Sequence, residues 1–187
     1  MILDKLRANT KQNHEDLEAE MLPMIKGIRT KADYARLLRI FYGFYKPLEE
    51  GIDQYIGEHE LPDLQQRRKT SLILDDLVQL GQPFSDIPID ASAPSINSIG
   101  DAFGAMYVME GSTLGGKVIS KMIASGLGIN EQQGLSFFHG YGGETGSRWK
   151  TFLARLDVYS DTPEESAVVK TANDVFNRFQ HWIKEKK

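Results

Sequence analysis

Five glycines fall within seventeen residues of a stretch that otherwise has the apolar pattern of one long helix. They are Gly100, Gly104, Gly111, Gly115 and Gly116. Each glycine inside a helix costs about 0.5–1 kcal/mol relative to alanine, so such a cluster requires a reason. At roughly 100° per residue, the first four lie within about 60° of one another around the helix axis. The stripe predicts either close packing against another helix or a bare, bent wall for a flat ligand.

The rest of the chain also has helical periodicity and no convincing strand alternation, which predicts an all-α fold. We expect one domain over residues 1–187, because no linker or repeat divides the chain. Residues 82–94, with three prolines, are expected to form a loop. The expected helices run from Leu3 to about Pro23, from Thr30 with a break or kink at Pro47, over 63–80, 95–125 and 131–138, from a cap at Ser147 to Leu156, and from Thr162 onward.

Composition excludes several classes of function. The chain has no cysteine, which removes disulfides, thiolate metal sites and cysteine nucleophiles. Its net charge of −4 argues against nucleic acid or an anionic membrane as the main partner. The N-terminal residues lack the uninterrupted apolar core of a signal peptide, and no apolar run is long enough to span a membrane. A cytoplasmic protein is the expectation.

Among the four histidines, His14 is the strongest candidate for a functional role. It follows Thr10 by four residues and precedes Leu17 by three, so it lies on the apolar face of the first helix. Such a histidine is either a hydrogen-bonded core residue or a nitrogen ligand presented to a buried metal. His139, at the start of a glycine-rich loop, is the second candidate.

Arg7 lies seven residues before His14, about 20° away around the helix and about 10 Å along it. A cofactor with a central metal and a carboxylate edge would use both side chains, although the spacing by itself slightly favours Arg7 as a surface charge. Glu110 is the one acid beside the glycine stripe in an apolar context. None of these features alone decides between a ligand site and ordinary packing.

Three segments together resemble the heme oxygenase family. LRANTKQNHEDLEAE (6–20) resembles the first helix of that family, which carries the heme ligand. YVMEGSTLGGKVI (107–119) resembles its glycine-rich distal helix, in the version typical of bacterial enzymes found with bacteriophytochromes. GLSFFHGYG (134–142) and RWKTF (148–152) are similar to the segment that follows. The order and spacing match over nearly the whole chain.

The resemblance implies a helical fold in which heme lies between the first helix and a kinked distal helix. His14 would bind the iron, and Arg7 and Arg178 would face the heme propionates. Gly111 and Gly115, with Gly116 in the same run, would let the distal backbone approach the ring. These roles are implied by the family and not by spacing alone.

The chain departs from animal-type heme oxygenases at Ser112, where those enzymes have an aspartate that orders water in the distal pocket. With Gly111 and Gly115, Ser112 is nevertheless expected at the catalytic wall. The implied reaction is oxygen- and electron-dependent cleavage of heme to biliverdin, with release of iron and CO. A ferredoxin or reductase would supply electrons, and a bacteriophytochrome is a candidate acceptor of biliverdin. A heme carrier of the same fold that does not degrade heme is the alternative.

Overall fold

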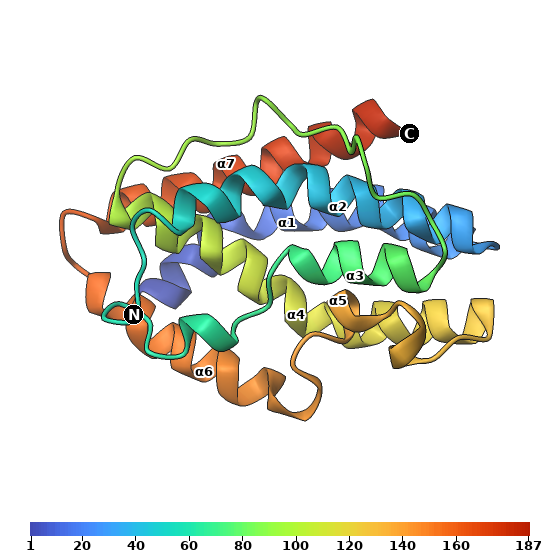
Figure 1. Ribbon diagram of the computed structural model, residues 1–187. Coiled ribbons are helices and arrows are strands. Elements are labelled where there is room, and N and C mark those ends of the chain that lie inside the picture. Colours follow the sequence, from blue (N-terminus) through green and yellow to red (C-terminus); the bar gives the residue numbers. More distant parts are fainter.

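Seven α-helices make up the regular structure of the residues described, as the all-α expectation requires (Figure 1). The computed structural model describes the backbone of residues 1–187 and every side chain except that of residue 131. The helices are α1 (Ile2–Gly27), α2 (Lys31–Ile52), α3 (Ser71–Gln79), α4 (Ile99–Leu127), α5 (Ser136–His139), α6 (Thr145–Leu156) and α7 (Glu165–Lys186). Short 3-10 turns lie at Leu64–Gln66, Glu131–Gln133, Gly142–Glu144 and Asp157–Tyr159. Among these residues, no helix combines the length and apolar character needed to cross a membrane.

Two internal prolines do not end their helices, whereas the sequence predicts an end near Pro23 and a break or kink at Pro47. α2 continues past Pro47, and α1 continues through Pro23 to its end at Gly27. Pro47 has no N–H, so the carbonyl of Gly43 loses its partner within the helix. The backbone N–H of Asp90 replaces it and donates to the Gly43 carbonyl at 2.9 Å. The break is therefore prevented by a loop that the local sequence does not identify.

Most helices begin within a few residues of the predicted position, and α2 begins at the predicted cap. Thr30 caps α2, and Asp33 completes the capping box by accepting the Thr30 N–H at 2.8 Å. Ser147 and Thr162 do not cap α6 and α7, since each hydroxyl donates to a carbonyl three residues earlier. These two helices begin at Thr145 and Glu165.

The expected helices over 63–80 and 131–138 are each divided. Between the turn at Leu64–Gln66 and α3, the helix is interrupted at Arg67, whose backbone is extended and whose side chain bonds to Glu110 of α4. In the second segment, Gly134 has a φ of +104° and ends the 3-10 turn before α5 begins.

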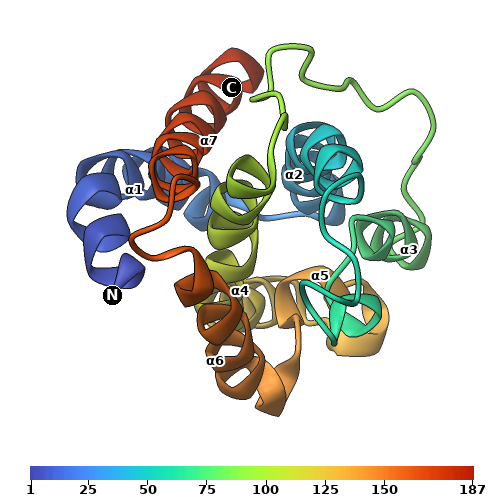
Figure 2. The same cartoon turned by 90° about the vertical axis from the view of Figure 1, so that its left-hand side faces the viewer.

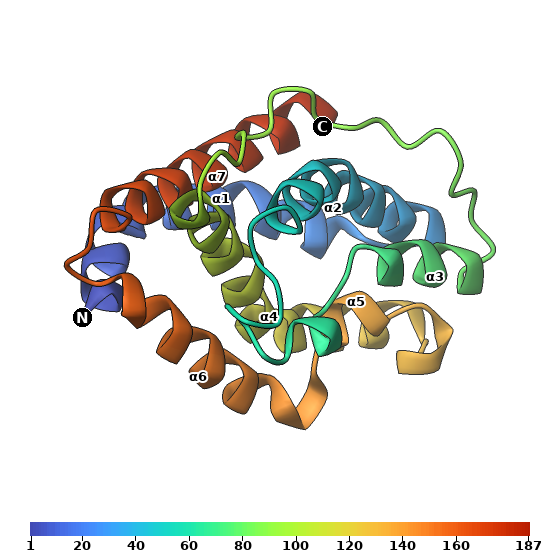
Figure 3. The ribbon, with the colours of Figure 1, turned by 60° about the vertical axis from the view of Figure 1, so that its left-hand side comes forward.

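α4 is continuous through all five clustered glycines and bends midway, which confirms the predicted kink (Figure 3). It begins at a Ser98 cap, later than expected. At the middle of the helix, the Ser112 hydroxyl donates to the Met109 carbonyl at 2.7 Å, and the Thr113 hydroxyl donates to the Glu110 carbonyl at 2.6 Å. Side-chain donors of this kind compete with the helical N–H groups and favour bending.

α4 occupies the centre of the molecule, with α1 and α7 on one side and α2 on the other (Figure 2). Its N-terminal half packs along α7, which in turn packs along α1. Beside the C-terminal half, aromatic rings from α2, α5 and α7 form a continuous cluster, in which Phe44 and Phe179 stack at 4.4 Å. The other rings of this cluster are Phe41, Tyr45, Phe137 and Phe138.

Candidate functional site

A half-open cavity of about 530 Å³ lies between α1 and α4. This volume lies within the range of about 300–1,000 Å³ that is typical of small-molecule and cofactor sites. α1 and α4 form its two long walls, and the aromatic cluster forms its floor. The polar side chains on its surface are few: Arg7, Thr10, His14, Glu18, Tyr45, Arg68, Tyr107 and Ser112.

Gly111 and Gly115 form the bare part of the α4 wall. A Cβ atom on Gly115 would meet no heavy atom within 4 Å. On Gly111 it would meet only the ring of Trp149, at 3.7 Å, which is ordinary contact. Both glycines line the cavity. The helix therefore presents open space above its backbone, as the ligand-wall interpretation of the stripe predicts.

The other glycines of α4 serve close packing instead. A Cβ on Gly104 would lie 2.4 Å from the carbonyl oxygen of Val168 in α7, and Gly100 faces the same helix. Gly116 was expected at the cofactor, but this placement is wrong. It faces α5, where its Cβ would lie 2.5 Å from the carbonyl oxygen of Phe138. The packing interpretation thus holds at these three positions.

His14 lines the cavity from the α1 side and remains accessible. Its side chain is 53% exposed, more than an apolar helix face predicts, because it faces the open cavity and not packed core. The ring contacts Phe176, with centroids 5.2 Å apart, and Nε2 lies 3.2 Å from Oε1 of Glu18. His139, the second candidate, ends α5 and does not line the cavity.

Arg7 lies at the exposed rim of the same cavity. Its guanidinium makes no hydrogen bond or ion pair with any of the side chains or backbone groups described. A cation in this position is available to an anionic group of a ligand. The structure therefore places His14 and Arg7 on one cavity, as their spacing along the helix predicted.

Arg178 is not at the cavity, which corrects our expectation that it faces a ligand. Its Nε and Nη2 atoms donate to the two carboxylate oxygens of Asp90, each at 2.7 Å, and Nη1 donates to Glu185 at 2.9 Å. These bonds raise the pKa of Arg178. The side chain instead fixes the loop before α4 to α7, in a pairing that sequence position could not reveal.

Arg68 is the most important cavity residue that the sequence did not identify. Its Nη2 donates to the Ser112 hydroxyl and to the Met109 carbonyl, both at 2.6 Å, and the guanidinium lies 4.3 Å above the Phe137 ring. The Tyr45 hydroxyl lies beside Arg68 and Ser112, and burial raises its pKa. In the sequence, Arg68 belongs to a charged run that is typical of a solvated surface.

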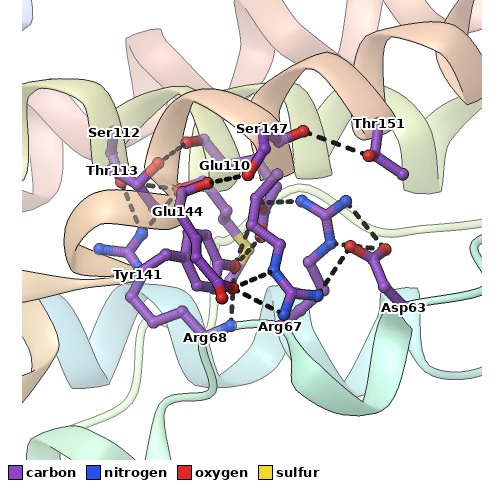
Figure 4. Close-up of polar contacts among 12 residues, drawn as sticks. Asp63, Arg67, Arg68, Glu110, Ser112, Thr113, Tyr141, Glu144, Ser147 and Thr151 are labelled. Atoms are coloured by element: carbon purple, nitrogen blue, oxygen red, sulfur yellow. Dashed lines mark hydrogen bonds and ion pairs between the residues drawn. The ribbon is translucent and has the colours of Figure 1, made fainter.

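Behind this wall lies a buried ionic cluster, which includes Glu110 (Figure 4). The carboxylate of Glu110 accepts a hydrogen bond from Arg67 at 2.7 Å and another from the Tyr141 hydroxyl at 2.8 Å. Asp63 binds the other side of Arg67, with Nη2 to Oδ1 at 2.9 Å, and also binds Arg148 at 3.0 Å. Glu110 itself does not line the cavity. Its unusual apolar context in the sequence reflects this buried pairing.

Fold and site together define a class: an all-helical protein with a half-open cavity between two helices, lined by an accessible imidazole, an arginine and bare helix backbone. The family model described as heme oxygenase matches residues 1–77 and 90–185. The chain therefore belongs to the heme oxygenase family and is an enzyme that acts on heme.

Relatives and solved structures agree with this assignment. The heme oxygenase PigA of Pseudomonas aeruginosa is 28% identical over 94% of this chain and 87% of its own length. A heme oxygenase of Xanthomonas campestris is 31% identical over 66% of this chain and 72% of its own. In fold, the chain resembles heme oxygenase from Neisseria meningitidis, with a TM-score of 0.83, 21% identity and coverage of 100% and 92% of the two chains. Heme oxygenase-1 of Synechocystis in complex with heme gives a TM-score of 0.70 at 19% identity, covering 98% and 91%.

Proposed function

We propose that this protein binds heme in the cavity between α1 and α4, with His14 as the iron ligand, and cleaves it to biliverdin, iron and CO. One observation carries the proposal: an accessible imidazole and the bare backbone of Gly111 and Gly115 line the same cavity from opposite helices. When bound, heme supplies the iron at which oxygen and electrons react, and the ring that is opened.

The residues present fit such a ligand. The walls are mostly apolar, which suits the faces of a porphyrin. The open space above Gly115 accommodates atoms of a ligand where any larger residue would place its own side chain. Arg7 supplies a positive charge at the rim, where a carboxylate edge would remain close to solvent.

His14 can provide a ring nitrogen to the ligand. In the structure, its Nε2 contacts the Glu18 carboxylate, but both side chains are more than half exposed, at 53% and 61%. An exposed pair of this kind contributes about 0–1 kcal/mol, so the contact yields readily to a stronger ligand. Phe176 remains behind the ring and limits its rotation.

The distal wall combines bare backbone with two polar groups. Gly111 and Gly115 leave room for a small molecule beside the helix, and Ser112 and Arg68 provide a hydroxyl and N–H donors on the same wall. We assign to this pair the ordering of water that an aspartate performs in animal-type enzymes. The remaining guanidinium N–H groups of Arg68 are suited to hold an acceptor such as water.

Electrons come from an external donor such as a ferredoxin or a reductase in this proposal, because the sequence contains no flavin or nicotinamide fingerprint. A bacteriophytochrome is the proposed acceptor of biliverdin. The resemblance of residues 107–119 to enzymes found with such photoreceptors supports it. Transfer of product from the enzyme to an added apo-bacteriophytochrome, measured by red absorption, tests this acceptor.

The experiment that tests the function is a hemin titration followed by reduction. We expect one hemin per chain with an intense Soret band, then loss of that band and formation of biliverdin when oxygen and ferredoxin with its reductase, or ascorbate, are added. A Soret band that persists through many equivalents of reductant would favour the heme carrier. A failure to bind hemin in a defined ratio would contradict both functions.

A further inference from the structure

Arg68 reaches the cavity from a segment that lacks regular secondary structure. Residues 67–70 connect the 3-10 turn at Leu64–Gln66 to α3, and they are not part of either element. The direction of the Arg68 side chain therefore depends on bonds to neighbouring elements. Its guanidinium end is fixed at α4, as described above. Its backbone end requires a separate anchor.

That anchor is the hydroxyl of Tyr141, which lies at the cluster behind α4 (Figure 4). The oxygen accepts the backbone N–H of Arg68 at 2.8 Å and donates its own proton to Oε1 of Glu110 at 2.8 Å. The Arg68 guanidinium binds the Met109 carbonyl and the Ser112 hydroxyl. Glu110 lies between these two residues in the sequence. One phenol thus connects the backbone of Arg68 to the same turn of α4 that the Arg68 side chain contacts.

The charges around Tyr141 favour this double role. Arg67, whose side chain is 1% exposed, neutralises Glu110, and Asp63 holds Arg67 from the other side. The Glu110 carboxylate thus accepts hydrogen bonds from both the Arg67 guanidinium and the Tyr141 phenol. Burial, together with Glu110, raises the pKa of Tyr141, so the phenol keeps its proton and has a lone pair for the Arg68 N–H.

We propose that Tyr141 and Glu110 are positioning residues, which set the direction in which Arg68 presents its guanidinium to the cavity at Ser112. Neither residue lines the cavity, so they act only through Arg68. The consequence for catalysis rests on the function proposed above, whereas the anchoring itself does not. The test is therefore made both without and with heme.

The first measurement is hydrogen exchange at the Arg68 amide in the full, ligand-free chain. In Tyr141→Phe, we expect this amide to exchange about tenfold faster, because a phenylalanine cannot accept its hydrogen bond. Tyr159→Phe is the matched control, since Tyr159 is also partly buried but contacts Phe103. An Arg68 amide that exchanges at the wild-type rate in Tyr141→Phe would overturn the proposal.

The second measurement uses CO on the reduced hemin complex as a probe of the distal charge. A cation near the bound probe lowers its C–O stretching frequency, so we expect Arg68→Leu to raise it and Tyr141→Phe to raise it by less. The double variant should equal Arg68→Leu alone, because Tyr141 acts through Arg68. If Tyr141→Phe lowers thermal stability but leaves the C–O stretching frequency unchanged, the role of Tyr141 is merely structural and the proposal is overturned. Additive frequency shifts in the double variant would also overturn it. An unmoved band in Arg68→Leu would contradict the proposed role of Arg68 in function, while the exchange result would still decide the anchoring.

Discussion

Two pairs of glycines in α4 have the same spacing but serve different purposes. In the N-terminal half, Gly100 and Gly104 lie four residues apart and allow the backbone of α7 to approach. Farther along the helix, Gly111 and Gly115 have the same spacing, yet nothing but open cavity and one indole ring lies above them. Glycines four residues apart thus mark a place where another helix or a ligand can approach the helix backbone. Which object comes close depends on the helices packed around it.

The charged residues of the two regions differ in a similar way. In the packed region, Arg178 is fully engaged by Asp90 and Glu185, and it joins a loop to α7. At the cavity, Arg7 has no partner among the residues described, and His14 has only an exposed one. Arg7 thus remains available to a ligand at the cavity where we propose that heme binds. Groups that are satisfied internally hold the scaffold.

The largest effect is expected in the packed half. Gly104→Ala should destabilise the protein by about 3 kcal/mol, because the new methyl group cannot share space with the backbone carbonyl of Val168 and α7 must move. Gly115→Ala is the matched control and should stabilise the protein by about 0.4–1 kcal/mol. Urea unfolding of both variants measures the difference. Equal effects of the same sign would remove the distinction between the two halves.

Gly115→Leu should leave the fold intact and reduce heme turnover by about a hundredfold, which corresponds to about 2.7 kcal/mol in the barrier. The leucine would extend into the open space above residue 115, where the small reactant must fit. Biliverdin formation per enzyme, compared with Gly115→Ala, is the measurement. Turnover at the wild-type rate would show that the cavity half of α4 is not a distal wall.

Arg7→Glu should weaken heme affinity by roughly ten- to a hundredfold, as expected for loss of a charge-assisted bond of about 1.5–3 kcal/mol. The ring should also lose its fixed orientation and yield a mixture of biliverdin isomers. Arg178→Lys, which keeps the charge in the packed region, should leave both affinity and isomer unchanged. Hemin titration and product chromatography check the pair. A single unchanged isomer at unchanged affinity would make Arg7 a surface charge.

The smallest effect concerns an exposed clasp between α1 and α7. Lys5 pairs with Asp161 and Glu165, and the pKa of Glu165 is lowered by the backbone N–H of Asp161 and by Lys5. A lowered carboxyl pKa adds stability above its ordinary value of 4.5, and this addition is lost as the pH falls below that value through the folded pKa. In Lys5→Met, the free energy of unfolding should therefore decrease slightly less steeply as the solution is acidified, and hemin binding should be unchanged. Identical curves between about pH 3 and 7 would show that the clasp contributes nothing.

Much of the fold could be predicted from local sequence because helix starts and periodicity are local properties. Thr30 and Asp33 are three residues apart, and their capping box identifies the start of α2. Pro47 does not break α2, because the group that compensates for its missing N–H comes from Asp90, more than forty residues later, and local sequence could not show this. The prediction of one helix over 63–80 was wrong for a similar reason, since Arg67 has an extended backbone and its side chain bonds to Glu110 on α4, far away in the sequence.

The site could be predicted in part. His14, Arg7 and the glycines lie on two helices whose faces the periodicity reveals, so their meeting at one cavity followed from the pattern. Arg68 could not be found in this way, because it lies in a charged run whose two arginines point to different partners. The prediction that Arg178 faces a ligand was wrong, because nothing in the sequence of its helix shows that Asp90 binds it.

Central to this account is the placement of the iron ligand on α1, opposite the bare backbone of α4. The most direct test is the absorption spectrum of hemin bound to His14→Ala, compared with the wild type and with His139→Ala. We predict that His14→Ala keeps its helical content but loses the stoichiometric Soret band, whereas His139→Ala keeps it. An unchanged Soret band in His14→Ala would contradict the account and move the search for the ligand to His139.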